Sequence, residues 1–167
     1  MQGIKKQSTA KYVMTMVTIC FIAVIFINSL VPGDVSGQMS GSILTWINGV
    51  FSSIGLPLQM THYVVRKTAH FTEYFIFGVL LLATLRLYRE KIKDGIFSVL
   101  FIGLSVPVVD ETIQRFVDGR GGEIKDVWID FSGVVTGLFI CFLISLWILH
   151  NKNKKSNHKK GYRYYAR

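Results

Sequence analysis

Four long apolar segments constrain this chain more than any other feature of its sequence. A helix needs about 20 mostly apolar residues to cross the hydrocarbon core of a bilayer, and residues 12–31, 70–88, 95–114 and 127–149 each supply such a run. Hydrophobic residues make up 50% of the 167 residues, and the mean hydropathy is +0.40, which is too apolar for a water-soluble domain of this size. The sequence therefore predicts an all-α membrane protein built as a four-transmembrane-helix bundle.

The membrane domain is expected to occupy residues 1–150, and a basic cytoplasmic tail is expected at 151–167. The first apolar segment follows three lysines, as a signal peptide would, but it is longer than the apolar region of a signal peptide and no Ala-x-Ala cleavage pattern follows it. It is therefore predicted to be an uncleaved first span.

The basic residues are unevenly distributed along the chain. With four spans, the N-terminus, the 86–94 loop and the tail share one side of the membrane and carry 14 of the 19 Lys and Arg residues. The positive-inside rule then places both termini in the cytoplasm. A basic tail beside an anionic leaflet needs no nucleic acid as a partner, so the expected partners of this positive charge are membrane lipids.

A short amphipathic segment lies between the first and second spans. Residues 35–41 are rich in Gly and Ser and are expected to form a flexible outer loop, and Ser42 is a plausible helix cap. Apolar residues recur at helical spacing over 43–54, which is too short to span a bilayer. We therefore expect a short interfacial helix on the outer face, acting either as a simple connector or as a ledge for a lipid-bearing ligand.

Polar and charged residues gather at the outer ends of the last three spans. Ionisable side chains inside an apolar span are costly to desolvate, so a set that converges from three helices indicates a functional site. The simpler interpretation is that the basic members anchor the helix ends at the headgroups and neutralise the acids. The set comprises Arg66, Lys67, His70, Glu73 and Tyr74 of the second span, Asp110, Glu111 and Gln114 of the third, Arg120 in a glycine-rich loop, and Asp126 and Asp130 of the fourth.

Several of these residues form motifs that resemble those of the VanZ-like family of small bacterial membrane proteins. The motifs are Lys67-x-x-His70-Phe71-x-x-Tyr74 followed by Gly78, Asp110-Glu111-x-x-Gln114-x-Phe116, Gly119-Arg120, and Asp126-x-x-x-Asp130-x-x-Gly133-x-x-x-Gly137. The similarity extends over most of the chain, from about residue 12 to residue 149. Two positions depart from the family pattern: Asp118 stands where Pro is usual, and Asp130 where Asn is frequent.

The resemblance implies a multi-pass protein of the bacterial cell membrane that acts in the cell envelope. The family takes its name from accessory proteins of glycopeptide antibiotic resistance, which are associated with lowered susceptibility to teicoplanin, a lipid-tailed glycopeptide. By the spacing of its glycines, the fourth span is also expected to pack closely against another helix through Gly133 and Gly137.

The first functional hypothesis is a binding or accessory protein of the envelope, which needs no cofactor. Its outer polar pocket would hold the headgroup of a lipid-anchored molecule, such as a cell-wall precursor, while the bilayer accepts the lipid tail. The ligand-binding residues would be Arg66, Lys67, His70, Tyr74, Asp110, Glu111, Gln114, Arg120, Asp126 and Asp130.

The alternative is a membrane-embedded hydrolase or transferase that acts on a lipid-linked substrate, and the sequence does not decide whether the protein is an enzyme. His70 with Glu73 or Asp110 would form a general-base pair, or the carboxylates of Glu73, Asp110, Glu111 and Asp130 would join His70 in holding a divalent metal. A set with one histidine and no cysteine suits Mg²⁺, Mn²⁺ or Ca²⁺ better than zinc. Proton-coupled transport fits less well, because the middle of each span is apolar.

Overall fold

The computed structural model describes residues 2–89 and 91–165, with side chains from residue 8 to residue 152 except residue 90, and also at 154. The described residues form α-helices joined by loops and one 3₁₀ turn, and they contain no strand. The helices are α1 (Gln2–Ser29), α2 (Gly33–Ser53), α3 (His62–Tyr88), α4 (Ile96–Gln114) and α5 (Ile124–Tyr165), with the 3₁₀ turn at Ile92–Asp94.

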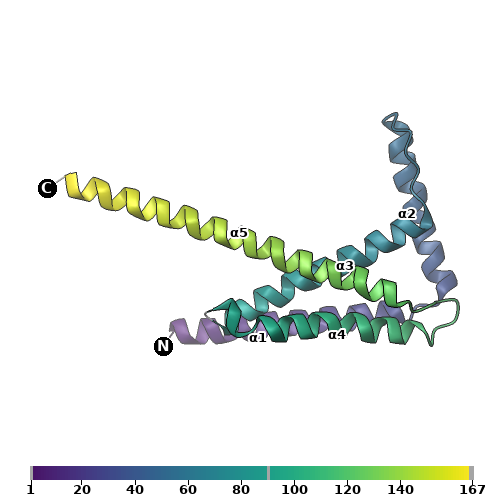
Figure 1. The fold of residues 1–167 in the computed structure, drawn as a ribbon, viewed down its shortest axis with the longest axis horizontal. Coiled ribbons are helices and arrows are strands. Elements are labelled where there is room, and N and C mark those ends of the chain that lie inside the picture. The colour runs from purple at the N-terminus through teal and green to yellow at the C-terminus, as the bar shows by residue number, and fades with distance from the viewer. Residues whose placement is uncertain (1, 90, 166–167) are drawn as a thin grey trace.

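Four of these helices are long and apolar enough to cross a membrane, which confirms the predicted fold class. The candidate spans are Ser8–Ser29, His62–Tyr88, Ile96–Gln114 and Ile124–Lys152. The N-terminal end of α1 and the C-terminal end of α5 both lie on the left in Figure 1, away from the loop that joins α4 to α5. α5 continues as a helix to Tyr165, so no break in secondary structure separates the tail from the last span.

The second span begins earlier than the hydropathy pattern indicates. α3 starts at His62 rather than at residue 70, because the hydroxyl of Thr61 caps it by accepting a hydrogen bond from the backbone N–H of Val64 (3.3 Å). Arg66 and Lys67 therefore lie on the same helix as His70, although they precede the apolar run that predicted the span. Their side chains belong to the same helical surface as His70, one turn later.

The expected flexible loop at residues 35–41 is helical, and this expectation was wrong. α2 runs from Gly33 to Ser53 without interruption, and Asp34 in its first turn stabilises the helix N-terminus. Several hydroxyls inside the helix donate to carbonyl oxygens four residues earlier, as Ser40 does to Ser36 (2.6 Å) and Ser53 does to Gly49 (2.8 Å). These serines therefore need no partner outside the helix, and the composition that suggested a loop is compatible with α2.

Ser42, expected as the cap of a shorter helix, lies in the interior of α2 and donates to the carbonyl oxygen of Gln38 (3.2 Å). α2 has no buried residue and is not among the candidate spans. It runs crosswise to α1 and α4 (Figure 1), as a helix lying along the membrane surface would.

The closest helix packing in the bundle joins α3 to α5. A Cβ atom added at Gly133 would lie 2.6 Å from the carbonyl oxygen of Phe71, and one added at Gly137 would collide with the carbonyl oxygen of Phe75. On the facing side, Gly78 of α3 allows the same close approach to the backbone of Val134. The prediction that Gly133 and Gly137 face another helix is confirmed.

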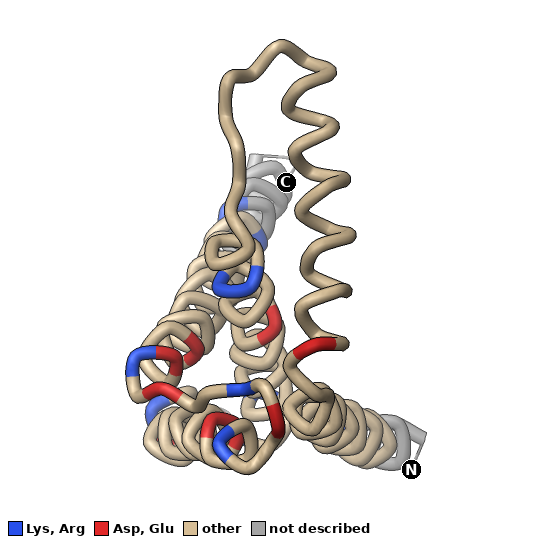
Figure 2. The backbone as a smooth tube through the Cα atoms, turned by 90° about the vertical axis from the view of Figure 1, so that its right-hand side faces the viewer, with Lys and Arg blue, Asp and Glu red and all other residues tan. Residues whose placement is uncertain are grey.

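The apolar core lies between α1, α3, α4 and α5, and its fully buried members include Ile25, Tyr74, Phe77, Leu82 and Val134. Beyond this core, at the end where α1, α4 and α5 meet the loops, most of the acidic residues gather (Figure 2). The same end holds the start of α3, so that the three predicted polar clusters converge in space.

Candidate functional site

The acidic residues at this end of the bundle are buried, although they are polar. Asp110 is 2% exposed, Glu111 is 4% exposed and Asp130 is completely buried. Asp110 and Glu111 come from the last full turn of α4, and Asp130 lies two turns inside α5, where the glycine-mediated packing brings α5 against α3. The close approach of the helices therefore places carboxylates from two helices in one interior region.

His70 of α3 completes this group. His70, Asp110, Glu111 and Asp130 each offer one side-chain nitrogen or oxygen atom, and these four atoms lie within 4.8 Å of one another. The Nδ1 atom of His70 is 3.7 Å from Oδ1 of Asp130, too far for a hydrogen bond. We refer to these four residues as the His–carboxylate cluster.

Asp110 is held by hydrogen bonds from three helices. Ser29 of α1 donates to Oδ1, and Tyr74 of α3 donates to Oδ2 (2.9 Å). Gln114, one turn further along α4, also donates to Oδ2 (3.3 Å). These contacts fix the orientation of the carboxylate, and one of them comes from the hydroxyl of Tyr74, a residue predicted to bind a ligand.

Gln114 lies between the acids and the arginines and is 1% exposed. Its Nε2 donates to Asp110 and to Glu111 (both 3.3 Å), while its Oε1 accepts long hydrogen bonds from Arg66 and Arg120 (both 3.4 Å). The amide thus presents its donor to the carboxylates and its acceptor to the cations, and it keeps the two sets of charges apart.

Arg120 closes the end of α1. Its Nε donates to the carbonyl oxygen of Val31 (2.9 Å) and its Nη2 to that of Asn28 (3.0 Å), which also accepts from the backbone N–H of Val31 (3.2 Å). Carbonyls at the end of a helix lack the partners of the helix interior, so the guanidinium supplies donors there. Burial lowers the pKa of the Arg120 guanidinium from its ordinary value, and the positive charge of Arg66 lowers this pKa further. An arginine pKa is high enough that the side chain stays charged despite this.

Lys67 and Asp126 form an ion pair between α3 and α5. Both side chains are largely buried, with 18% and 12% of their surface exposed. The ammonium group of Lys67 also lies 5.3 Å from the centre of the Tyr63 ring, a cation–π arrangement. Lys67 therefore neutralises Asp126, and it makes no ion pair with the His–carboxylate cluster.

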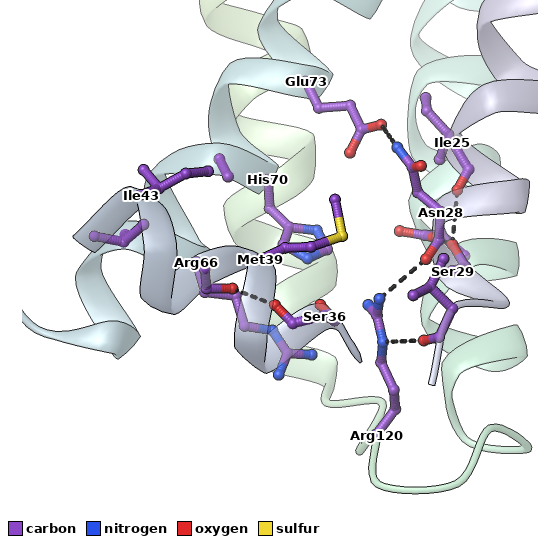
Figure 3. A pocket seen from close by; sticks show the side chains of 15 residues that line it. Ile25, Asn28, Ser29, Ser36, Met39, Ile43, Arg66, His70, Glu73 and Arg120 are labelled. Carbon is purple, nitrogen blue, oxygen red and sulfur yellow. Dashed lines mark hydrogen bonds between the residues drawn. The ribbon is translucent and has the colours of Figure 1, made fainter. Parts of the chain in front are cut away.

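A cavity of about 210 Å³ lies beside the cluster, between α1, α2 and α3. Its walls carry cationic Arg66 and Arg120, together with apolar side chains that include Met39 and Ile43 of α2. In Figure 3, α2 forms one side of this cavity, α1 carries Ser29 and Asn28 on the other, and Arg120 closes it from the loop. We refer to this cavity as the outer pocket.

The outer pocket and the His–carboxylate cluster share His70 and Asp110. Glu73, predicted to act with His70, also lines the pocket but is not a member of the cluster. It accepts a hydrogen bond from Nδ2 of Asn28 (3.0 Å), on the side facing α1. The sequence-predicted residues are thus divided between a cluster, a pocket wall and the separate Lys67–Asp126 pair.

Two residues of this region were missed from the sequence, Asn28 and Ser29 at the end of α1. Ser29 is 2% exposed and donates to Asp110, and Asn28 contacts Glu73 and Arg120. The available signal was that two polar residues end an apolar run on the same side of the membrane as the other clusters. That signal is weak, because polar residues commonly end a span.

Comparison with known proteins places the chain in a family. The model of the family described as VanZ/LLP1 matches residues 14–145. The match begins near the middle of α1 and ends within α5. No curated protein matches the chain, and no solved structure does. Because the match covers most of the chain, including every residue of the cluster and the pocket, this chain belongs to the VanZ/LLP1 family of membrane proteins.

Proposed function

We propose that this protein binds the headgroup of a lipid-anchored or lipid-tailed molecule in the outer pocket, at the external face of the bacterial membrane. The observation that carries the proposal is the composition of the pocket wall. Two arginines and His70 face the same cavity as the apolar side chains of Ile25, Met39 and Ile43. An amphiphile needs such a combination, because its anionic group and its first methylenes require different surroundings.

Arg66 is the residue best placed to contact an anionic group. Its only side-chain hydrogen bond to the described residues is the long one to Gln114, so most of its five N–H donors remain available. A guanidinium suits phosphate or carboxylate because it can donate two parallel hydrogen bonds. Arg120 contributes positive charge, while its Nε and Nη2 hold the end of α1.

The class of ligand follows from position as well as charge. The pocket lies at the end of the bundle where α2 runs crosswise, and α2 contributes exposed apolar residues such as Trp46. A lipid-linked cell-wall precursor or a lipid-tailed glycopeptide such as teicoplanin would place its polar part in the pocket and its tail in the adjacent bilayer. Sequestering either molecule would lower glycopeptide susceptibility, which is the phenotype that the family resemblance implies.

The test is mass spectrometry of lipids that co-purify with the detergent-solubilised protein, with Arg66→Gln compared with wild type. We expect the wild type to retain an anionic lipid-linked molecule and Arg66→Gln to lose most of it. Lys125→Gln is the matched control, because Lys125 is an exposed basic residue at the same end of the bundle that does not line the pocket. Equal retention by all three proteins would contradict the proposal.

The second candidate function is catalysis on the same class of ligand, and one observation favours it. His70 and Asp110 belong both to the pocket wall and to the cluster, so a headgroup bound in the pocket would lie against groups that can move protons. Incubating the purified protein with a lipid-linked diphosphate and searching for cleaved or transferred products distinguishes an enzyme from a binding protein. A ligand that binds and is recovered unchanged would support binding alone.

A further inference from the structure

We propose that the His–carboxylate cluster binds one divalent cation that prefers oxygen ligands, of the Mn²⁺ or Mg²⁺ type, through His70, Asp110, Glu111 and Asp130. This inference concerns the cluster itself and does not depend on which ligand the outer pocket takes. It rests on four observations: the spacing of the donor atoms, the state of Asp130, the distribution of nearby charge, and the hydrogen bonds that orient the carboxylates.

The spacing permits a single ion to reach all four residues. Oxygen ligands lie about 2.0–2.1 Å from Mg²⁺ and about 2.3–2.6 Å from Ca²⁺, so two ligands on opposite sides of one such ion are about 4–5 Å apart. The four donor atoms lie within 4.8 Å of one another. They come from α3, α4 and α5, so the ligands surround a point in the interior rather than lining one helix face.

Asp130 is the observation that points most directly to a ligand. It is completely buried, and neither of its carboxylate oxygens has a hydrogen-bond partner among the described residues. The Nδ1 atom of His70, which faces it at 3.7 Å, is also buried and without a partner. Buried polar atoms in this state are costly, and an ion between Asp130 and His70 would satisfy both residues at once.

Protonation of Asp130 alone would not satisfy the buried polar atoms of both Asp130 and His70. A neutral carboxyl group carries an O–H that needs an acceptor of its own, and Nδ1 of His70, at 3.7 Å, is too far away to accept it and would remain without a partner. A cation needs no such acceptor, because it uses the carboxylate lone pairs directly.

The surrounding charges leave the three acids without a protein cation. Across the described ranges, the only Lys or Arg that forms an ion pair with an acid is Lys67, and its partner is Asp126. Arg66 and Arg120 contact the amide of Gln114 and backbone carbonyls instead. Up to three negative charges therefore converge in the interior, and a divalent ion would offset two of them.

Hydrogen bonds from outside the cluster orient the carboxylates, as they do around known metal sites. Ser29 and Tyr74 donate to Asp110, and the backbone N–H of Glu123 donates to Oε2 of Glu111 (3.0 Å). Gln114 donates to both carboxylates. These partners fix the two side chains. Oδ2 of Asp110 accepts two of the hydrogen bonds, whereas Oδ1 of Asp110 and both oxygens of Glu111 accept one each and keep a lone pair for an ion.

The donor set defines the class of ion. Three carboxylates and one imidazole, without a thiolate, suit Mn²⁺ and Mg²⁺ better than the softer metals. Four protein ligands leave positions free on an ion that prefers six. Because His70 and Asp110 also line the outer pocket, those free positions would be accessible from it.

The experiment uses the full chain, purified in detergent, treated with EDTA and desalted. Mn²⁺ is added, and the free ion is measured by its electron paramagnetic resonance signal. We expect saturable binding of one Mn²⁺ per chain, competition by Mg²⁺, and affinity lowered by more than about tenfold in Asp130→Asn and in Glu111→Gln. Asp34→Asn is the matched control, since Asp34 is an exposed acid at the same end of the bundle but outside the cluster, and it should bind as the wild type does.

Thermal unfolding keeps the result interpretable if one variant folds poorly. Mn²⁺ should raise the unfolding temperature of the wild type and of Asp34→Asn, and should leave that of Asp130→Asn unchanged. The proposal is overturned if the wild type shows no saturable binding, or if Asp130→Asn and Glu111→Gln bind Mn²⁺ as tightly as the wild type. Saturable binding of Zn²⁺ without binding of Mn²⁺ would overturn the proposed class of ion.

Discussion

Lys67 donates to Asp126 across the interface between α3 and α5, and no other Lys or Arg in the described part of the chain forms an ion pair with an acid. The interpretation that the basic residues exist to neutralise the buried acids therefore applies to one pair only. Asp110, Glu111 and Asp130 are left to hydrogen-bond donors, or to a bound cation, for their compensation. This distinction makes the roles of the charged residues experimentally separable.

The first prediction concerns this ion pair. Lys67→Gln and Asp126→Asn should each lower the free energy of unfolding by about 1–3 kcal/mol, because each leaves a largely buried charge without its partner. The double variant should lose less than the sum of the two single losses, since neither charge is then left unpaired. The measurement is reversible unfolding in detergent. Strictly additive losses would show that the two residues do not interact in solution.

The second prediction separates a functional site from a structural one. Glu111→Gln, Asp130→Asn and His70→Gln should preserve membrane abundance and thermal stability and should abolish the phenotype. The first two remove a buried ionisable group with little change of shape, and the third replaces one by a neutral polar side chain. The readouts are abundance and thermal stability, measured alongside glycopeptide susceptibility in the same cells. If all three variants lose abundance together with the phenotype, the cluster is structural.

The third prediction tests the contact between α3 and α5. Gly137→Ala should lower the free energy of unfolding by about 1–3 kcal/mol, because its Cβ would collide with the carbonyl oxygen of Phe75 and force the helices apart. Gly49→Ala in α2 is the matched control, since a Cβ there meets nothing within 4 Å. The control should be neutral or slightly stabilising. Equal effects on detergent stability would mean that the two helices do not pack as described.

The fourth prediction concerns orientation in the membrane. In a chain whose Cys20 and Cys141 are replaced by alanine, a cysteine at Gly121 should react with a membrane-impermeant thiol reagent applied to whole cells. A cysteine at Asp94 should react only after the cells are opened. Gly121 is suitable because a side chain there meets nothing within 4 Å. The reverse labelling pattern would place the termini outside.

The sequence predicted the four spans and the convergence of three polar clusters, because both follow from hydropathy and from the alternation of spans across a membrane. It did not predict where α3 begins. Arg66 and Lys67 look like residues outside a span as long as their partners on neighbouring helices, Gln114 and Asp126, are unknown. It also did not predict the full length of α2, whose serines bond within the helix. Both errors concern polar side chains that composition alone predicts to be exposed to water. In the structure, other residues of the chain supply their hydrogen-bond or ion-pair partners.

The candidate site was predicted as one group, and the structure divides it. Spacing along a helix shows which residues share a face, and on that basis Glu73 was expected beside His70. The structure turns Glu73 toward Asn28 and brings Asp130 toward His70 instead. Which of two neighbouring helices a side chain meets depends on how α1 and α5 pack around α3, and a single sequence does not contain that information directly.

The bonds from Arg120 to the carbonyls of Asn28 and Val31 also bear on how the chain is made. The first span leaves the ribosome and enters the bilayer before Arg120 has been synthesised, since about 90 residues separate the bonded groups along the chain. Until the loop between α4 and α5 has been made and has reached this end of the bundle, the C-terminal end of α1 has no guanidinium to close it. The hydrogen bonds at the C-terminal end of α1 are thus completed only when α4, α5 and the loop between them have been inserted.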